Sequence, residues 1–363
     1  RRLFALAVVV NLTLLAYYAF FVGMGDYGII NGNESLYVES AREMALSGQW
    51  AIPTLNGLPY LEKPPLLVWL LTGCRLLFGA SEWSARLATS AAGLTLVLSL
   101  VRYSVLLGIG RYGFAAGFIL ATSLGMDVMS RVAMPDLLLT LLFASACFSY
   151  MAALRSRSLA HLRLGAALLG ASALLKGPLS MALFALIVLG QYALEPAQRA
   201  WMREALRDRL AVLLLILPLS LWLFAIEWQQ PGSIYYFIVN EHLLRFLGLR
   251  EPHDYYSGSP FYYVPRLFLF LFPWAGVFLF GWLSSSRNVT AERAQVRRFL
   301  SLCVWIPFAF FSLSNAKANY YILVCLSAVA LLTADYLSDL LRARRRPHLV
   351  LAIAVPILLF ITI

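Results

Sequence analysis

The stretch that decides the fold is LAVLLLILPLSLWLFAIEW, residues 210–228. It contains a single charged side chain, Glu227, and a helix of this length would cross the roughly 30 Å of hydrocarbon in a bilayer. Further apolar runs occur near residues 3–22, 83–107, 112–126, 134–153, 160–175, 178–194, 260–283, 299–313, 320–340 and 348–363. We therefore predict about eleven spans, all helical, because isolated strands cannot satisfy their backbone groups in lipid.

The composition supports the same fold class. Of the 363 residues 61% are hydrophobic and only 13% are charged, and the mean hydropathy is +0.76. We expect an all-α integral membrane protein with a single transmembrane domain over residues 1–363 and no C-terminal soluble domain in this chain. The chain begins without Met and stops inside an apolar run, which leaves open that its ends are trimmed.

The formal net charge of +11 raises the question of nucleic acid, and the placement of arginine answers it. If Arg1 and Arg2 lie on the inner side, each predicted span moves the chain to the other side of the membrane. Counted in this way, the other clustered arginines also fall in inner loops, as the positive-inside rule describes. These are Arg111, Arg155, Arg157, Arg163, Arg199, Arg203, Arg207, Arg209, Arg287, Arg293, Arg297, Arg298, Arg342, Arg344, Arg345 and Arg346. The excess charge therefore indicates topology and contact with anionic membrane lipids, and we expect no nucleic-acid partner.

Common cofactor motifs are not found in the sequence. It has no P-loop, no Rossmann glycine fingerprint and no His-Glu-x-x-His helix. The four cysteines, Cys74, Cys147, Cys303 and Cys325, show no paired spacing and predict neither a disulfide framework nor a zinc knuckle.

Charges of both signs gather in the predicted outer segments. The two long ones are residues 23–82 and 229–259, and short turns lie at 127–133, 176–177 and 314–319. They hold Glu34, Glu62, Lys63, Asp127, Arg131, Lys176, Glu241, His242, Arg245 and Lys317, with Asp136 just below the surface. This pattern indicates one functional site on the outer face, roofed by the two long segments. The alternative is that these are ordinary loop charges.

The first outer segment is unusually apolar for a loop. In ESLYVESAREMALS, residues 34–47, the side chains of Tyr37, Ala41, Met44 and Ala45 recur at helical spacing, and Gly48 follows where a C-cap belongs. After Pro64-Pro65, the stretch LLVWLLTGCRLLF is too short to span the bilayer comfortably. We expect two interfacial helices that frame a polar loop.

Six short motifs in this order resemble those of a known family. They are ESLYVESAREMALSGQWAIPTLNGLPYLEKPPLLVWL from Glu34, SRVAMPDLLLT from Ser130, LLKGP from Leu174, NEHLLRF from Asn240, SGSPFYYVPRLFLFLFPW ending at Trp274, and FFSLSNAKANYYIL containing Lys317. The chain resembles the polyprenyl-phosphate-sugar glycosyltransferases of the C-type superfamily, which include the lipid A 4-amino-4-deoxy-L-arabinose transferases and the protein O-mannosyltransferases.

The resemblance implies a membrane glycosyltransferase. Such an enzyme takes a sugar from a polyprenyl phosphate, undecaprenyl phosphate in bacteria, and passes it to a hydroxyl or phosphate of a lipid or protein acceptor. It also implies residence in the inner (plasma) membrane, an active site on the periplasmic side and a role in modifying lipid A or another cell-envelope glycan. One base and one displacement would invert the anomeric carbon.

The phosphate leaving group needs cations, because it departs as a stable anion. Lys63, Arg245 and Lys317 are predicted to stabilise its growing charge. The family match adds Arg131, in the second acidic motif, and Tyr321, in the last motif, to the donor-binding residues.

The acceptor hydroxyl needs a carboxylate to orient it and take its proton, a contribution of typically 10²- to 10⁴-fold. In the family this base is an acid of the first outer loop, in an Asp-Glu pair that opens the interfacial helix. Here the matching pair is Asn33-Glu34, and an amide cannot act as the base, so we expect Asn33 to be the N-cap instead. Glu34 and Asp136 are the remaining catalytic candidates. The alternative for Asp136 is a first-turn acid behind Pro135, stabilised by the helix dipole.

A divalent metal ion is the one cofactor for which the loops offer ligands. Glu62 and His242 have suitable chemistry to share such an ion across the two long outer segments. The alternative is that His242 is only hydrogen-bonded.

Two rival functions remain open. A lipid or sugar transporter would place polar groups near the bilayer midplane, where this sequence has almost none. A non-catalytic relative that binds a polyprenyl lipid would account for Asn33.

Overall fold

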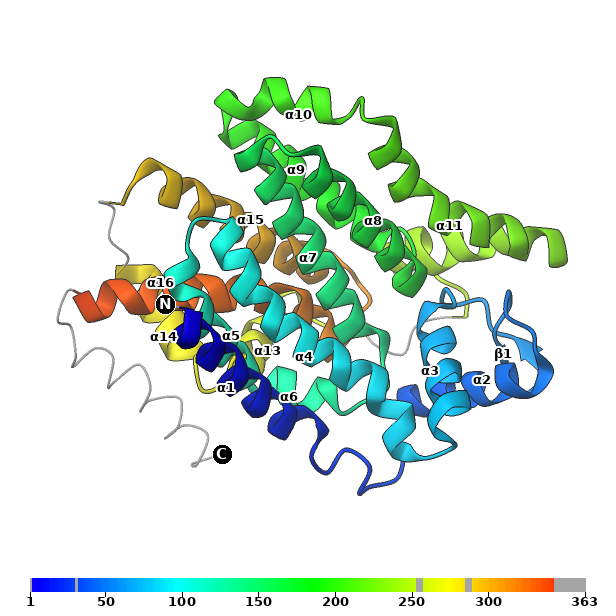
Figure 1. Ribbon diagram of the computed structural model, residues 1–363. Coiled ribbons are helices and arrows are strands. Elements are labelled where there is room, and N and C mark those ends of the chain that lie inside the picture. Colours follow the sequence, from blue (N-terminus) through cyan, green and yellow to red (C-terminus); the bar gives the residue numbers. More distant parts are fainter. Residues whose placement is uncertain (1, 30–31, 253–256, 285–288, 343–363) are drawn as a thin grey trace.

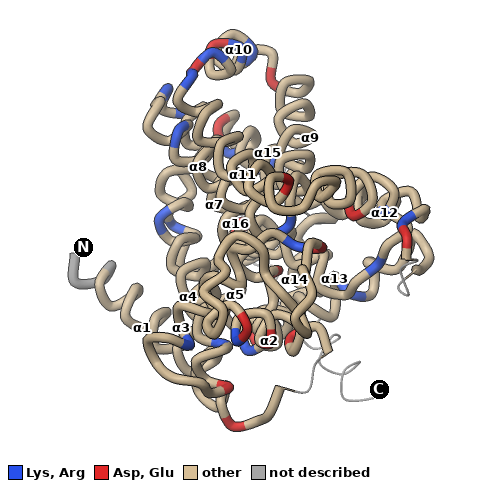
Figure 2. The backbone as a smooth tube through the Cα atoms, turned by 90° about the vertical axis from the view of Figure 1, so that its right-hand side faces the viewer, with Lys and Arg blue, Asp and Glu red and all other residues tan. Residues whose placement is uncertain are grey.

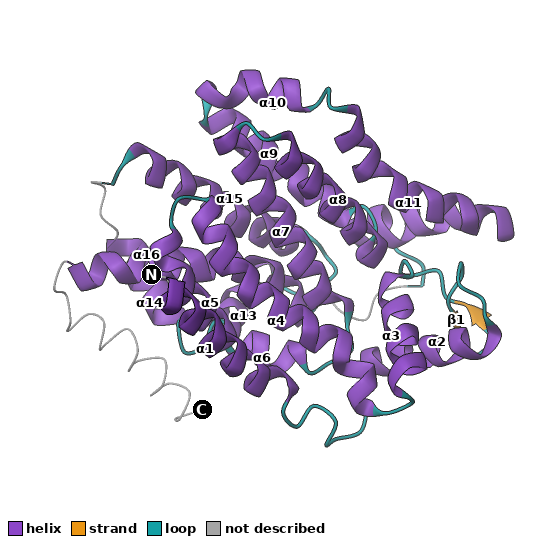
Figure 3. Ribbon diagram, in the orientation of Figure 1, coloured by secondary structure: helices purple, strands orange, loops and turns teal. Residues whose placement is uncertain are grey.

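The computed structural model describes residues 2–29, 32–252, 257–284 and 289–342. Most of the described chain is helix, with one short pair of strands within the first outer segment (Figure 3). The all-α class expected from the hydrophobic runs is thus confirmed.

Six helical segments are long and apolar enough to cross a membrane unaided. Each coincides with a predicted run: α4 (Glu82–Leu106), α7 (Pro135–Ser156), α8 (Leu159–Lys176), α11 (Arg209–Gln229), α15 (Ala291–Leu313), and η5 (Asn319–Cys325) continued by α16 (Leu326–Arg342). The chain is therefore a multi-pass membrane protein, since six such segments need a hydrocarbon environment.

Three further predicted runs form bent helix pairs. The bends are 63° between residues 110–121 and 124–130, 109° between 179–194 and 196–205, and 110° between 260–270 and 275–283. Their elements are η1 (Gly110–Tyr112), α5 (Gly113–Ala121), α6 (Leu124–Ser130), α9 (Leu179–Leu194), η2 (Pro196–Gln198), α10 (Arg199–Ala205), η4 (Pro260–Tyr262), α13 (Tyr263–Phe270) and α14 (Ala275–Ser284).

The expected total of eleven spans stays a prediction. Counting each bent pair as one span gives nine in the described ranges. The run at 3–22 forms α1 (Arg2–Phe21), a helix of 20 residues that is not among these nine. The run at 348–363 lies outside the described residues.

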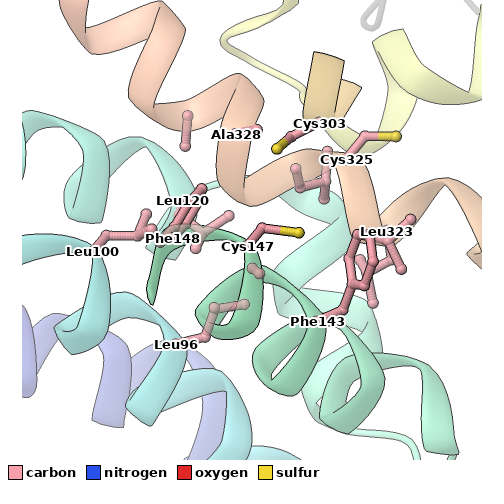
Figure 4. Close-up of a cluster of buried hydrophobic side chains, with 14 of the residues drawn as sticks. Leu96, Leu100, Leu120, Phe143, Cys147, Phe148, Cys303, Leu323, Cys325 and Ala328 are labelled. Carbon is pink, nitrogen blue, oxygen red and sulfur yellow. The ribbon is translucent and has the colours of Figure 1, made fainter. Parts of the chain in front are cut away.

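Helix α7 lies at the centre of the bundle, between α4 and α8 (Figure 1). Within its most apolar window 89% of the residues are buried, compared with 22% for α11 at the periphery. Three of the cysteines lie in this core: Cys147 of α7 faces Cys303 and Cys325 among leucine and phenylalanine side chains (Figure 4). Cys74, on α3 (Leu66–Phe78), is only partly buried. The apolar surroundings explain why thiols occur there without serving as ligands.

The first outer segment folds into two helices, as predicted, and a small hairpin. Its elements are α2 (Gly32–Ser47), β1 (Thr54–Leu55), β2 (Leu58–Pro59) and α3 (Leu66–Phe78). The apolar face predicted for α2 is confirmed in Tyr37, Ala41 and Met44, which are buried, and the amide of Gly48 closes the last turn on the carbonyl of Met44. The interfacial position of α2 and α3 remains a prediction.

The N-cap role expected of Asn33 is wrong. Helix α2 begins at Gly32, so Asn33 lies inside the first turn, and the Ser35 hydroxyl donates to the Gly32 carbonyl (2.8 Å). The described helix thus starts two residues before Glu34, where a cap at Asn33 would have started it.

The second outer segment is also helical. It contains the ten-residue π-helix η3 (Tyr235–Leu244), followed by α12 (Arg245–Leu247). π-Helices are rare and occur often at functional sites, because the wider turn changes which side chains share a face.

Candidate functional site

A cavity of about 390 Å³ opens between the second outer segment and the ends of α8, α9 and α15. One part is lined by charged or polar groups: Lys63, Lys176, Glu241, His242 and Arg245. The rest is largely apolar, lined by Pro178, Leu179, Ala182, Ile238, Leu243, Phe246, Phe310, Phe311 and Ala316. An apolar cavity with a few convergent charges is the usual form of a ligand site.

Figure 2 shows how charge is distributed around this site. Mainly basic residues lie on α10 at one end of the bundle, and residues of both signs lie around α2 and α12, away from it. The region of mixed sign includes residues predicted for the outer face, and α10 carries Arg199 and Arg203, two of the arginines predicted for the inner loops.

Glu241 joins three cations at the polar end of the cavity. Its side chain is fully buried, and its carboxylate contacts Arg250 Nε (2.6 Å), Arg245 Nη1 (3.4 Å) and Lys63 Nζ (3.9 Å). Arg250 also pairs with Glu62 (3.1 Å). The residues come from η3, α12 and the loop before α3, so this network connects the two long outer segments.

Lys63 loses its charge at a lower pH than an ordinary lysine. Burial lowers the pKa of its ammonium to about 8, with a further lowering by Arg245, while Glu241 opposes the shift. Its Nζ donates to the Glu62 carbonyl (3.0 Å) and lines the cavity. The cluster thus has the cations that an anion site needs, and the ammonium of one of them, Lys63, loses its proton more readily than usual.

Asp136 pairs with Lys176 behind the cavity wall. Pro135 starts α7 and places Asp136 in its first turn, as expected, and Asp136 Oδ1 accepts a hydrogen bond from Lys176 Nζ (2.6 Å). Lys176 Nζ also lies 4.7 Å from the centre of the Tyr321 ring, and both residues line the cavity. The other oxygen, Oδ2, is buried and has no hydrogen-bond partner among the residues that the structure describes. One buried carboxylate oxygen of this pair thus has no protein partner in the described structure, and Asp136 itself is not among the residues that line the cavity.

Glu34 is fully engaged elsewhere. Its two oxygens accept hydrogen bonds from Arg86 Nε (2.8 Å) and Nη2 (3.0 Å), and Oε1 also accepts the backbone amide of Ala133 (2.9 Å). Arg86 is completely buried and donates to the carbonyls of Met24, Tyr27 and Gly28. Glu34 therefore holds the start of α2 against α4 and the turn before Asp136.

Two cations predicted for the phosphate have other contacts. Arg131 donates to the Ala19 carbonyl of α1 and pairs with Asp127 (3.3 Å). Lys317 Nζ donates to the carbonyls of Phe311 (2.9 Å) and Ser312 (2.7 Å), which end α15. Neither side chain lines the cavity. Both fasten helix ends, because a cation near unpaired C-terminal carbonyls is stabilised there.

The metal hypothesis for Glu62 and His242 does not fit the structure. Glu62 pairs with Arg250, and the two ring nitrogens of His242 face the carbonyls of Phe237 (2.7 Å) and Lys176 (3.1 Å). Burial lowers the pKa of the His242 imidazole. Within the described ranges no three His, Cys, Asp or Glu side chains group as metal ligands. His242 is thus the hydrogen-bonded histidine of the alternative interpretation.

The structure brings together Lys63, Arg245 and Tyr321 in one cavity. Three further residues, to which the sequence analysis gave no role, have important contacts: Lys176 and Glu241 in the cavity and Arg86 outside it. Lys176 and Glu241 were counted at the outer face but not assigned to the site. Arg86 lies within an apolar run, where an unpaired charge is costly and is expected to have a partner of opposite charge. That signal could have identified the pairing of Arg86 with Glu34.

Comparisons with known proteins agree with the motifs. Residues 62–238 match the family model described as dolichyl-phosphate-mannose-protein mannosyltransferase. The undecaprenyl phosphate-alpha-4-amino-4-deoxy-L-arabinose arabinosyl transferase 2 of Pseudomonas fluorescens is 29% identical over 93% of this chain and 60% of its own length. The corresponding transferase 1 of Sodalis glossinidius is 32% identical over 84% of this chain and 54% of its own. The chain thus spans 60% or less of the length of these relatives.

Solved structures give the same result. The crystal structure of ArnT from Cupriavidus metallidurans bound to undecaprenyl phosphate matches with a TM-score of 0.79 at 25% identity, over 91% of this chain and 60% of that one. The archaeal oligosaccharyltransferase AglB from Archaeoglobus fulgidus shares the fold alone, with a TM-score of 0.59 at 12% identity, over 98% of this chain and 54% of that one.

Fold and motifs together define the class: the chain resembles the C-type glycosyltransferases that use polyprenyl-phosphate sugars, as its sequence indicated. Within this class its similarity along most of its length is to the undecaprenyl phosphate-alpha-4-amino-4-deoxy-L-arabinose arabinosyl transferases.

Proposed function

We propose that the chain is the membrane part of a glycosyltransferase that moves a sugar from a polyprenyl phosphate to an acceptor hydroxyl or phosphate at the outer face of the inner membrane. The names of its relatives point to undecaprenyl phosphate as the lipid and to 4-amino-4-deoxy-L-arabinose as one candidate sugar. A lipid acceptor of the cell envelope fits a cavity whose wall is largely apolar.

The observation that carries this proposal is the two-part cavity. Lys63 and Arg245 offer cations to a phosphate, and the wall beyond them is formed by Leu179, Phe310 and Phe311. A phosphate attached to a long hydrocarbon chain matches both parts at once. A soluble nucleotide sugar would match only the first, since its base and riboses are polar.

The proposed chemistry uses the cations that line the cavity and the Asp136 carboxylate, which lies behind the cavity wall and pairs with Lys176. As the bond between sugar and phosphate breaks, the leaving oxygen gains charge, and the cations of Lys63 and Arg245 stabilise it. The Asp136 carboxylate accepts the proton of the acceptor hydroxyl through Oδ2, while Lys176 holds the other oxygen. Attack from the face opposite the phosphate inverts the anomeric carbon.

A non-catalytic polyprenyl-lipid binder is the second candidate, favoured by one observation. The position matching the family base is Asn33, and Glu34 beside it is committed to Arg86. Under this alternative the lipid binds the cavity and no sugar is transferred.

Turnover by purified protein separates the two. The protein is incubated with undecaprenyl-phosphate aminoarabinose and a lipid A acceptor, and the release of undecaprenyl phosphate and the modified lipid are both measured. Transfer that requires Asp136 supports the enzyme. Binding of undecaprenyl phosphate without transfer to any acceptor supports the lipid binder.

A further inference from the structure

Glu241 is a carboxylate in the place where a phosphate anion would bind. Its side chain lines the same cavity as Lys63 and Arg245 and lies within 3.9 Å of both cations, while its shortest contact is to Arg250. A phosphate held by Lys63 and Arg245 must therefore lie close to Glu241, since the three side chains share one wall. A site built only to bind anions would not place a buried carboxylate there.

The lipid changes its charge during the proposed reaction. The donor is a phosphodiester with one negative charge, whereas the product is a phosphomonoester that carries roughly −1.5 to −2 at pH 7. Repulsion by a neighbouring carboxylate grows in proportion to that charge, and the low dielectric of a buried site strengthens it. The product is therefore penalised more than the donor.

We propose that Glu241 is the residue that makes the site discriminate against the spent lipid and so speeds its release. This inference rests on the proposed function. Three cations, Lys63, Arg245 and Arg250, surround one fully buried carboxylate, so the site keeps enough positive charge to bind a monoanion. The same carboxylate opposes tight binding of a dianion, and without it the enzyme would be inhibited by its own product.

The test compares two lipid probes on the whole protein in detergent. Undecaprenyl phosphate stands for the product, and its methyl ester, a diester of fixed single charge, stands for the donor. Their Kd values are measured by displacement of a labelled polyprenyl phosphate. In Glu241→Gln the product should bind roughly ten- to a hundredfold more tightly relative to the diester than it does in the wild type. In turnover assays the variant should show stronger inhibition by undecaprenyl phosphate.

Two further variants keep the test informative. Glu241→Asp retains the charge and should retain the wild-type ratio of the two Kd values. Arg250→Gln removes the cation nearest to Glu241 and should shift the ratio the other way, toward weaker product binding. This variant also provides the answer if Glu241→Gln does not fold. Glu62→Gln is the matched control, because this carboxylate also pairs with Arg250 but its side chain is 37% exposed and screened by solvent.

Each outcome decides the matter. A changed ratio in Glu241→Gln with unchanged ratios in Glu241→Asp and Glu62→Gln supports the inference. Equal weakening of both probes in Glu241→Gln would mean that Glu241 only positions the arginines, and the inference is wrong. If neither probe binds the wild-type protein, the proposed function itself fails.

Discussion

Two buried carboxylates lie on either side of one turn, and their surroundings differ. Glu34 has both oxygens engaged by Arg86, with the Ala133 amide as a third donor, whereas Asp136, three residues after Ala133, keeps one oxygen without a partner in the described structure. A saturated buried ion pair stabilises a fold or fixes its geometry, and an unsaturated one is costly unless a ligand uses it. The difference favours a structural role for Glu34 and supports the proposed catalytic role of Asp136.

The strongest test of this contrast is Asp136→Asn. We expect kcat to fall by about 10²- to 10⁴-fold, because the amide cannot take the acceptor proton. Asp127→Asn is the matched control, since Asp127 is a partly exposed carboxylate on the neighbouring helix α6 and should leave kcat unchanged. The rate of sugar transfer at saturating donor measures both. Wild-type activity in Asp136→Asn would mean that Asp136 is not the base and that the base lies in the first outer loop.

Arg86→Met should test the architectural side. Because it leaves Glu34 buried without its main partner, we expect a loss of about 3–5 kcal/mol in the free energy of unfolding. Denaturant unfolding in detergent measures this loss. Arg42→Met is the control: Arg42 pairs with Glu39 on the exposed face of α2, and its loss should cost less than about 1 kcal/mol. Equal free energies of unfolding in the two variants would contradict a stabilising role for the Arg86–Glu34 pair.

The charge of Lys63 sets a pH dependence. Its pKa of about 8 lies below the ordinary lysine value, so the cation is mostly present at pH 7 and is lost as the pH rises through 8. Binding of the diester probe, whose own charge is constant, should therefore weaken between pH 7 and pH 9 by about tenfold. In Lys63→Arg the guanidinium stays charged, and the affinity should stay nearly level over this range. If the affinity of the wild type for the diester probe did not change with pH, the phosphate would not bind at Lys63.

Asn33→Asp should have the smallest effect. The new carboxylate would lie in the first turn of α2, where the helix dipole favours its charge by about 0.3–1 kcal/mol. With Asp136 available as the base, we expect kcat to change by less than about threefold. An increase of tenfold or more, with KM nearly constant, would show that the family base has been lost at this position.

The sequence predicted the fold from hydrophobic length alone, because a run such as 210–228 has few alternatives to a membrane helix. Lys63, Arg245 and Tyr321 were also found in one cavity, as a shared outer face requires. Arg131 and Lys317 do not line the cavity, and their contacts include backbone carbonyls, which no side-chain pattern reveals. The Arg86–Glu34 pair joins residues 52 positions apart, and such contacts depend on how helices pack rather than on the pattern within either helix.

The buried position of three cysteines makes the natural chain suitable for site-selective labelling. Cys147, Cys303 and Cys325 are enclosed by the core, whereas Cys74 is partly accessible on α3, the helix that follows Lys63. A maleimide dye should therefore react first at Cys74 without any cysteine being removed. Fluorescence from that position would report directly on how the loop that carries Lys63 responds when a lipid enters.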